Sequence, residues 1–517
     1  MKHYLAILVL SIIAILIHGY HFAVSDQEIF IPYILKFQNP NLFLGDILFD
    51  QSSARSSIFY PIYGYLINFV DLQVLFFASF LFFQFFFFLA IYRLSYVILK
   101  DQKLAYLALL PFFLPKFIGG TATSTFETFF GYRSLGILFL LYYLIYILEK
   151  RFLKSATIAG LGFLIHPLSI IPNLLLIPFS IVSSKEKLKV GVKSFLVFAI
   201  LTSPLLLVIQ TQGLFSSSSI RDQIWYSIIK IRDDYLFAST WSTREWLAFF
   251  LYPTLIILFL KRLRQMRKLI LLIVVVSLSI FLINFLILEI LEFPVLAQFQ
   301  LVRSISPLAY ISLAITPLFL LFQNPILKIT GWVAFVSLSL NLFNLFLASL
   351  VFLVLAMIIS KSDYSSSSIP PKMITATFLL VVFSHLILNF HAYLNLGKRI
   401  QFPKQAGDWI NLQLWAKANT PIDSAFLVHP TQTGFRIFSQ RTIIGDVKDG
   451  AVVMYDKNYA RRWYELVTEL KNYSTFNEDK FAELAGKYNF NFIVTLYDHQ
   501  LKFETVYKNK SFIIYKI

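Results

Sequence analysis

Residues 72–97 read LQVLFFASFLFFQFFFFLAIYRLSYV, a nearly unbroken apolar run whose one charged residue, Arg93, lies close to its end. A helix needs about 20 consecutive apolar residues to cross the hydrocarbon core of a bilayer, so this run is long enough. Similar runs recur along most of the 517 residues, and the chain is 57% hydrophobic with a mean hydropathy of +0.70. The sequence therefore predicts a polytopic α-helical membrane protein.

The pattern predicts about 13 transmembrane helices. The first apolar run follows Lys2, which places the N-terminus in the cytoplasm. A cleaved signal peptide is the alternative for this run, but the run is longer than a usual signal core and no small-residue cleavage site follows it. The predicted spans are 4–22, 72–97, 104–118, 134–148, two short helices within 155–182, 190–210, 246–260, 269–288, 308–322, 327–341, 345–360 and 373–395.

The stretch 155–182 decides the topology, because it is too long for one untilted helix and short for two full ones. Basic residues flank it on both sides, with Arg151 and Lys154 before it and Lys185 and Lys187 after it. By the positive-inside rule both ends are cytoplasmic, so the chain must enter the membrane and return. His166-Pro167, near the middle, is the predicted apex, because proline disfavours helix at the residue before it.

The charges follow the same topology. Lys and Arg outnumber Asp and Glu strongly at the predicted cytoplasmic ends, whereas acidic residues are in excess in the external loops before residue 396. The net charge of +17 therefore mostly records membrane orientation, and no nucleic-acid partner is expected. The absence of cysteine excludes disulfides and thiolate chemistry. We expect a multi-pass protein of the cytoplasmic (inner) membrane with an external C-terminus.

Two domains are predicted. Residues 1–395 form the multi-span domain, whose first external loop, 23–71, is amphipathic and is expected to lie along the membrane surface, with helices at 28–37 and 60–70. Residues 396–517 lack an apolar run of spanning length and are expected to form a small external α/β domain. Its predicted helices are 408–419, 459–472 and 478–487. Its predicted strands are 425–428, 436–444 as one or two strands broken at Ser439-Gln440, and 492–497, followed by a hairpin over 504–515.

Motifs typical of soluble enzymes are missing, so any chemistry must come from scattered residues of the external loops. The sequence offers these candidates: Asp26, Glu28, Asp46, Glu127, Arg133, His166 and Arg303. Asp26-Gln27-Glu28 is the most informative group, because carboxylates at the rim of so apolar a protein are costly.

Each of these candidates also has a simpler interpretation. Asp26 and Glu28 can cap and start a surface helix, with Ser25 or Asp26 as N-cap. Glu127 and Arg133 can form an ordinary interfacial ion pair, and Arg303 can extend to lipid headgroups. His166 can be a turn residue bonded to the backbone. Their shared membrane face, derived from charge alone, favours a common site.

An acid beside Arg and His at the outer rim suits a lipid-linked substrate. A polyprenyl phosphate leaving group needs cationic donors, and arginine offers a bidentate fork to phosphate oxygens. A carboxylate placed at an acceptor hydroxyl would act as the base for inverting sugar transfer. Desolvation at the rim could raise the pKa of such a carboxylate toward working pH.

These residues resemble the pattern of the GT-C superfamily of integral membrane glycosyltransferases. The resemblance rests on Ser25-Asp26-Gln27-Glu28, Phe126-Glu127 through Arg133, His166-Pro167 and Gln300 through Arg303, and it looks closest to an uncharacterised prokaryotic membrane family of that type. It implies transfer of a sugar from a polyprenyl-phosphate-linked donor to a glycan, lipid or protein acceptor, in cell-envelope assembly. The Trp-Trp-Asp signature of oligosaccharyltransferases is absent, so protein N-glycosylation is not implied.

The resemblance also implies residue roles. Asp26, with Glu28, matches the catalytic acid of the first external loop and Glu127 the acid of the second. Arg133, His166 and Arg303 match phosphate-binding donors, and a divalent metal, Mg or Mn, is a possible cofactor. Two other classes stay open: a lipid or glycan transporter, and a non-catalytic assembly or sugar-binding protein that uses Trp409, Trp415 or Trp463 for stacking, unless these tryptophans belong to the core.

Overall fold

The structure is a computed structural model that describes residues 2–50, 57–183, 188–211, 221–263, 265–360, 370–389, 399–402 and 407–517. Lys185, Lys187 and the predicted boundary between residues 395 and 396 lie outside these ranges.

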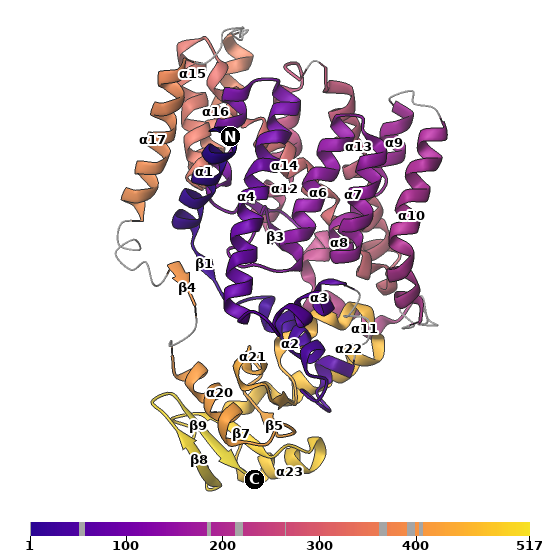
Figure 1. The fold of residues 1–517 in the computed structure, drawn as a ribbon, viewed down its shortest axis with the longest axis vertical. Coiled ribbons are helices and arrows are strands. Elements are labelled where there is room, and N and C mark those ends of the chain that lie inside the picture. The colour runs from indigo at the N-terminus through magenta and orange to yellow at the C-terminus, as the bar shows by residue number, and fades with distance from the viewer. Residues whose placement is uncertain are drawn as a thin grey trace.

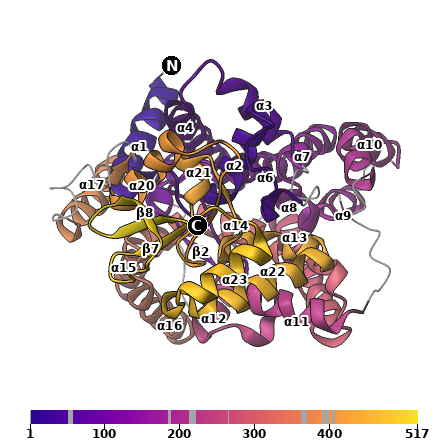
Figure 2. The same ribbon diagram turned by 90° about the horizontal axis from the view of Figure 1, so that it is seen from below.

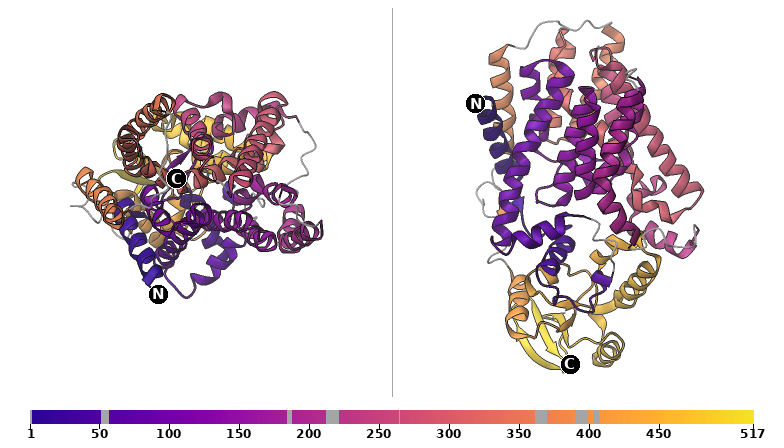
Figure 3. Two further views of the ribbon diagram at one scale, coloured as in Figure 1. Left: turned by 90° about the horizontal axis from the view of Figure 1, so that it is seen from above. Right: turned by 45° about the vertical axis from the view of Figure 1, so that its right-hand side comes forward.

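Apolar helices make up most of the chain and run alongside one another in a bundle (Figure 1). Viewed from above, many of them are seen nearly end-on (Figure 3, left). The main helices of the bundle are α1 (Lys2–His18), α4 (Leu72–Leu99), α6 (Tyr132–Leu148), α7 (Phe152–Ile165), α9 (Leu176–Ser183), α10 (Leu188–Thr211), α12 (Thr243–Phe259), α13 (Arg267–Phe285), α14 (Ser306–Ala314), α15 (Pro325–Ser339), α16 (Phe343–Ser360) and α17 (Pro371–Leu388).

Among the described residues, four helical segments are long and apolar enough to cross a membrane: Leu72–Leu99, Leu188–Val208, Arg267–Ile290 and Pro294–Leu321. Several other apolar helices are shorter, such as Lys2–His18. The structure thus shows a mostly helical protein with several apolar helices, and the count of about 13 spans stays a prediction.

Three predicted spans differ from the observed helices. The run 104–118 is not one helix but α5 (Gln102–Leu107) followed by the 3₁₀ turn η3 (Leu110–Phe113), and 308–322 is divided in the same way into α14 and η10 (Thr316–Leu321). Both second pieces begin around a proline, which has no N–H to continue an α-helix. The first helix ends at His18, and the short strand β1 (Tyr20–His21) then pairs in parallel with β4 (Ile400–Gln401).

The predicted break at His166-Pro167 is confirmed, because α7 ends at Ile165 and the short helix α8 (Pro167–Ile170) begins directly after His166. The second half is more irregular than expected. It continues through the 3₁₀ turn η4 (Ile171–Asn173) before α9 begins.

The C-terminal residues contain a five-stranded sheet in the order β6-β5-β7-β9-β8. Strand β5 pairs in parallel with β6 and β7, whereas β9 pairs antiparallel with β7 and β8. The strands are β5 (Ala425–Leu427), β6 (Thr442–Ile443), β7 (Phe492–Leu496), β8 (Glu504–Lys508) and β9 (Phe512–Lys516); the accompanying helices are α20 (Asp408–Asn419), α22 (Lys457–Glu469) and α23 (Glu478–Tyr488).

One C-terminal prediction is wrong: the first part of 436–444 is not a strand but the helix α21 (Phe435–Ser439). Gly434 and Gln440 have left-handed φ values of 80° and 50°, which set off a single helical turn between them. The hydroxyl of Ser439 donates to the carbonyl of Phe435 inside this turn. The polypeptide then enters β6, so only the end of the predicted strand is extended.

A layer of short helices lies between the bundle and the sheet (Figure 1; Figure 3, right). Seen from below, the C-terminal elements β7, β8, α22 and α23 lie in front of the bundle (Figure 2). The predicted helices of the first loop belong to this layer as α2 (Gln27–Gln38) and α3 (Phe59–Leu66), together with α11 (Gln223–Arg232) and the 3₁₀ segment η11 (Val447–Tyr455). The indole of Trp225 on α11 donates to the carbonyl of Val453 at 2.8 Å. The C-terminal residues therefore pack directly onto loops of the helical part.

Candidate functional site

A cavity of about 520 Å³ lies within this layer. It is lined by residues from the first loop, the loop before α6, the break after α7, the segment before α14, and the C-terminal segment η11. Among the predicted site residues, the lining includes Asp26, Glu127, Arg133, His166 and Arg303. The structure thus brings five residues from widely separated loops to one place.

Arg133 joins the two acids at the centre of the cavity. Its Nη2 donates to Oδ2 of Asp26 at 2.6 Å, and its Nη1 donates to Oε1 of Glu127. Asp26 occupies the N-cap position of α2 but has helical φ and ψ, and its side chain makes no capping bond. Capping therefore does not explain Asp26, whose carboxylate is directed to Arg133 instead.

Gln27, the middle residue of the acidic motif, holds the start of α2 against the start of α6. Its buried amide donates to the carbonyl of Phe130 at 2.9 Å and accepts from the backbone N–H of Val24 at 3.2 Å. Gly131 permits the close approach, because a Cβ there would lie 2.7 Å from the ring of Phe30. These contacts bring Asp26 and Arg133 within hydrogen-bond distance.

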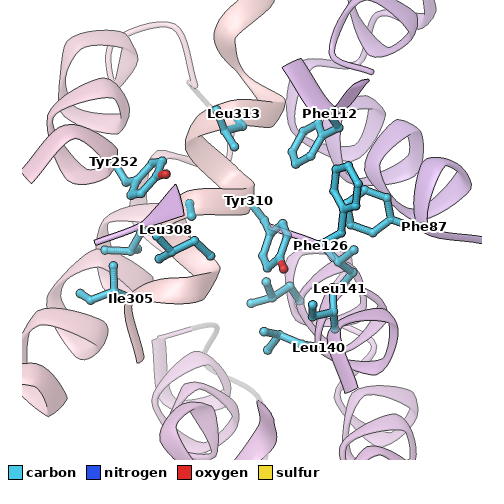
Figure 4. Packing of buried hydrophobic residues seen from close by; sticks show 14 of the residues in the cluster. Phe87, Phe112, Phe126, Leu140, Leu141, Tyr252, Ile305, Leu308, Tyr310 and Leu313 are labelled. Atoms are coloured by element: carbon cyan, nitrogen blue, oxygen red, sulfur yellow. The ribbon is translucent and has the colours of Figure 1, made fainter. Parts of the chain in front are cut away.

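The residue before Glu127, Phe126, belongs to the apolar core (Figure 4). The ring of Phe126 packs against Phe87 with 5.3 Å between centroids. The phenol of Tyr310 donates to the carbonyl of Thr125 at 2.8 Å. Because both neighbours on its N-terminal side are tied to the bundle, the Glu127 carboxylate has a fixed position.

His166 is buried at the rim of the cavity. Its Nδ1 lies 2.7 Å from the hydroxyl of Ser169, and its ring meets Tyr132 edge-on at 4.7 Å between centroids. Its Nε2 has no hydrogen-bond partner among the described residues. His166 therefore bonds to a side chain rather than only to backbone, and one ring nitrogen remains for a ligand.

Gly136 on α6 makes the site of His166 possible, because a Cβ there would lie 2.8 Å from Cβ of His166 and 2.6 Å from the Ser169 hydroxyl. We expect Gly136→Ala to displace His166 and to destabilise the protein by roughly 1–3 kcal/mol, the usual cost of overpacking. Thermal unfolding in detergent measures this loss of stability as a lower melting temperature. Gly191→Ala, where nothing lies within 4 Å of the added Cβ, is the matched control; equal melting temperatures for the two variants would contradict the prediction.

Glu28 and Asp46 do not line the cavity. Glu28 accepts a side-chain hydrogen bond from Thr433, and burial raises its pKa despite that bond and nearby Lys448. Asp46 is buried in an ion pair with Arg436, at 2.7 Å and 2.8 Å. Glu28 and Asp46 thus contact the C-terminal residues instead of the cavity.

The tryptophans proposed for sugar stacking pack within the C-terminal residues. The ring of Trp409 lies against Phe435 and Phe512, and that of Trp415 lies against Tyr507. Trp463 is buried and donates to the carbonyl of Asp446. These contacts support the core interpretation of the three residues.

The polar residues of the cavity to which sequence reasoning gave no site role include Arg232, Asp233, Gln300 and Lys448. Arg232 and Asp233 belong to the charged run 230–234, which was visible in the sequence. Gln300 adjoins the Arg303 motif and was noted there without a role. Nothing near Lys448 marks it, because only the fold brings η11 to the cavity.

Buried polar atoms without a partner are concentrated here. Among the described residues, those that line the cavity are Nε of Arg133, Nε2 of His166, Nε of Arg232, Oδ2 of Asp233, Oε1 of Gln300 and Nε of Arg303. An unsatisfied buried polar group costs about 1–3 kcal/mol, so a cluster of them is expensive. Such a cluster is typical of a site whose polar ligand supplies the missing bonds.

The acids of the cavity differ in their pKa values. Burial alone would raise the pKa of Asp26, but Arg133, Lys448 and Arg303 outweigh it and hold this pKa below the usual value. Burial dominates at Glu127 and raises its pKa, and it raises the pKa of Asp233 to about 7. The raised pKa values of these two acids reduce the negative charge of the lining, which suits an anionic ligand.

The donor set does not fit a divalent metal. Arg133 already bonds to both Asp26 and Glu127, so its guanidinium occupies the position between the carboxylates. No group of three or more His, Asp or Glu side chains in the described part of the chain is arranged to hold a metal ion. The carboxylates and the guanidinium group therefore support acid–base chemistry and ionic binding by the side chains themselves.

Three comparisons relate the chain to known proteins. Residues 407–470 match a family model described as a domain of unknown function, DUF6798. No curated protein matches the chain. Among solved structures, the chain is similar to the oligosaccharyltransferase of Archaeoglobus fulgidus, solved tethered through a disulfide bond to an acceptor peptide with an NVT sequon; the identity is 12%, the TM-score is 0.48, and the match covers 96% of this chain and 69% of that one.

Proposed function

We propose that the protein is a GT-C-like membrane glycosyltransferase that moves a sugar from a polyprenyl-phosphate-linked donor to an acceptor on the external face of the membrane. The observation that carries this proposal is the single cavity in which Asp26 and Glu127 adjoin Arg133, Arg303 and His166. A carboxylate for the acceptor and cations for the phosphate are the two groups that the reaction needs.

The proposed step is an inverting displacement. The acceptor hydroxyl oxygen attacks C1 of the sugar, the bond between C1 and the phosphate oxygen breaks, and its electron pair stays on the phosphate. The acceptor proton passes to Asp26. Arg303 and the free Nε2 of His166 bind the phosphate oxygens as their charge grows, while Arg133 orients the Asp26 carboxylate.

The apolar part of the lining suits the lipid chain. Phe163, Leu168, Ile171 and Leu206 line the cavity on the side of α7 and α10. The polyprenyl chain would extend along these residues, with its phosphate toward Arg303. In this proposal the protein lies in the inner membrane, its N-terminus is cytoplasmic, and residues 396–517 form an external domain. The acceptor is a glycan, a lipid or a protein.

A photoreactive polyprenyl phosphate tests this function. Purified protein in nanodiscs is expected to be labelled on peptides that contain the cavity residues, with competition from unlabelled farnesyl phosphate, and Arg303→Ala should abolish the labelling. Release of polyprenyl phosphate from a radiolabelled lipid-linked sugar then reports turnover. Specific labelling without turnover of any donor would favour a sugar-lipid-binding protein, and movement of the lipid between leaflets would favour a transporter.

Asp233 makes donor binding depend on pH. The ionisable groups that face it are Arg232, Asp234, Tyr235, Arg303 and Tyr455. Below pH 7 it is neutral and leaves Arg303 to the phosphate; above pH 7 its charge competes for Arg303 and repels the ligand.

We therefore expect the affinity for farnesyl phosphate to fall in the wild type, relative to Asp233→Asn, as pH rises through about 7. Thermophoresis of both proteins between pH 5.5 and 8.5 measures the ratio. In Asp233→Asn, the affinity changes with pH only through the ionisation of the phosphate and of the other residues. If the affinities of the two proteins change with pH in the same way, Asp233 does not titrate in this pH range.

A further inference from the structure

We propose that η11 is a fixed wall of the catalytic cavity and that Lys448 on this wall binds the phosphate of the lipid-linked donor. This inference rests on the proposed function and assigns its substrate a further ligand. It also gives a role to the C-terminal residues, which sequence reasoning had left as a separate domain.

Lys448 reaches the cavity opposite the first loop. Its Nζ lies 3.9 Å from Oδ1 of Asp26, and its side chain, which is 28% exposed, is part of the cavity lining. No hydrogen bond from this ammonium group is found within the described part of the chain. A lysine with three donors beside Asp26, whose other oxygen is already bonded to Arg133, is placed to meet a phosphate group.

The backbone around Lys448 is fixed by a reciprocal capping box. Oδ1 of Asp446 accepts from the N–H of Lys448 at 2.8 Å and from that of Asp449 at 3.1 Å. Oδ2 of Asp449 accepts in turn from the N–H of Asp446 at 3.0 Å. These bonds leave the start of η11 one conformation, from which Lys448 points to the cavity.

Arg436 ties this turn to the first loop. Its guanidinium makes bidentate contacts to Asp46, at 2.7 Å and 2.8 Å, and to Asp449, both at 2.8 Å. All three side chains are at most 3% exposed. We call this group the Arg436 clamp. Because the loop that carries Asp46 also carries Asp26, the clamp sets the distance between the two sides of the cavity.

The far end of η11 is anchored separately. Trp225 donates to the carbonyl of Val453, and the amide of Gln300 lies 3.1 Å from the sulfur of Met454. The wall is thus held by α11 and by the segment before Arg303 as well as by the clamp. The DUF6798 match, 407–470, contains both Arg436 and Lys448, so in this proposal the matched region forms one wall of the cavity.

The test measures binding of farnesyl phosphate to the full-length protein in nanodiscs by thermophoresis at pH 7. Lys448→Met is expected to raise Kd at least tenfold, and Lys448→Arg, which keeps the charge, is expected to recover most of the affinity. Lys471→Met, at an exposed lysine of the same C-terminal region, is the matched control and should bind like the wild type. Melting temperatures of all variants are measured alongside.

The outcomes separate the two proposals. Wild-type protein that is folded but does not bind farnesyl phosphate would overturn the proposed function. Wild-type binding that is unchanged in Lys448→Met would overturn this inference alone. A loss of binding in Lys448→Met that Lys448→Arg does not recover, together with a lowered melting temperature, would show that Lys448 is structural and would also overturn it.

Discussion

Asp26→Asn is expected to lower the rate of sugar transfer by about 10²–10⁴-fold, the usual contribution of a general base. The amide keeps the shape of the side chain but cannot accept the acceptor proton. Arg133 remains paired with Glu127 in this variant, so the fold and membrane insertion should persist. Turnover of a lipid-linked sugar in nanodiscs gives kcat and KM separately, and the loss should lie in kcat.

Two further variants sharpen this experiment. Asp479→Asn, at an exposed acid in the first turn of α23, should match the wild type. Asp26→Glu restores a carboxylate at a shifted distance and should recover part of the rate. If Asp26→Asn turns over at the wild-type rate, Asp26 is not the base, and Glu127 or Asp233 becomes the carboxylate to test.

Replacement of Arg436 by methionine should destabilise the protein by about 3–5 kcal/mol, because it leaves two buried carboxylates without their cation. Asp46 and Asp449 have exposed fractions of at most 1%, so water cannot replace the guanidinium. Chemical unfolding in detergent, followed by tryptophan fluorescence, measures the change. Trp463, whose indole donates to the carbonyl of Asp446 beside the clamp, should report it.

The matched control is an ion pair on the surface. Glu483→Gln breaks the contact between Lys480 and Glu483, which is largely exposed, and should leave the unfolding transition in place. The double variant Arg436→Met with Asp46→Asn should regain part of the loss, because one buried charge is removed with its partner. Unfolding of Arg436→Met at the wild-type denaturant concentration would show that the clamp contributes little.

Features that depend on neighbouring residues could be predicted from the sequence. The break at His166 follows from the proline after it, and α2 follows from its amphipathic pattern. The gathering of Asp26, Glu127, Arg133, His166 and Arg303 also followed from charge, because the loop assignment placed them on one face. Their roles in catalysis remain predictions.

Features that depend on distant contacts could not be predicted. The helix α21 replaces the first part of a predicted strand; its apolar residues suit both structures, and left-handed residues at Gly434 and Gln440 bound the helical turn. Glu28 has the same chemistry as Asp26 and differs only in which side of α2 it occupies. Lys448 carries no local signal, since its place in the cavity depends on packing against loops early in the chain.

The Arg436 clamp joins residues that are 390 positions apart, and a bond from Arg399 to the carbonyl of Ile17 spans 382. A ribosome therefore finishes nearly the whole protein before the first loop can meet its partners. Helices inserted earlier would wait in the bilayer with Asp26 and Arg133 in place but one side of the cavity missing. The cavity is thus completed only after the last part of the chain has been made, and a product that ends before residue 436 lacks both the clamp and the wall that carries Lys448.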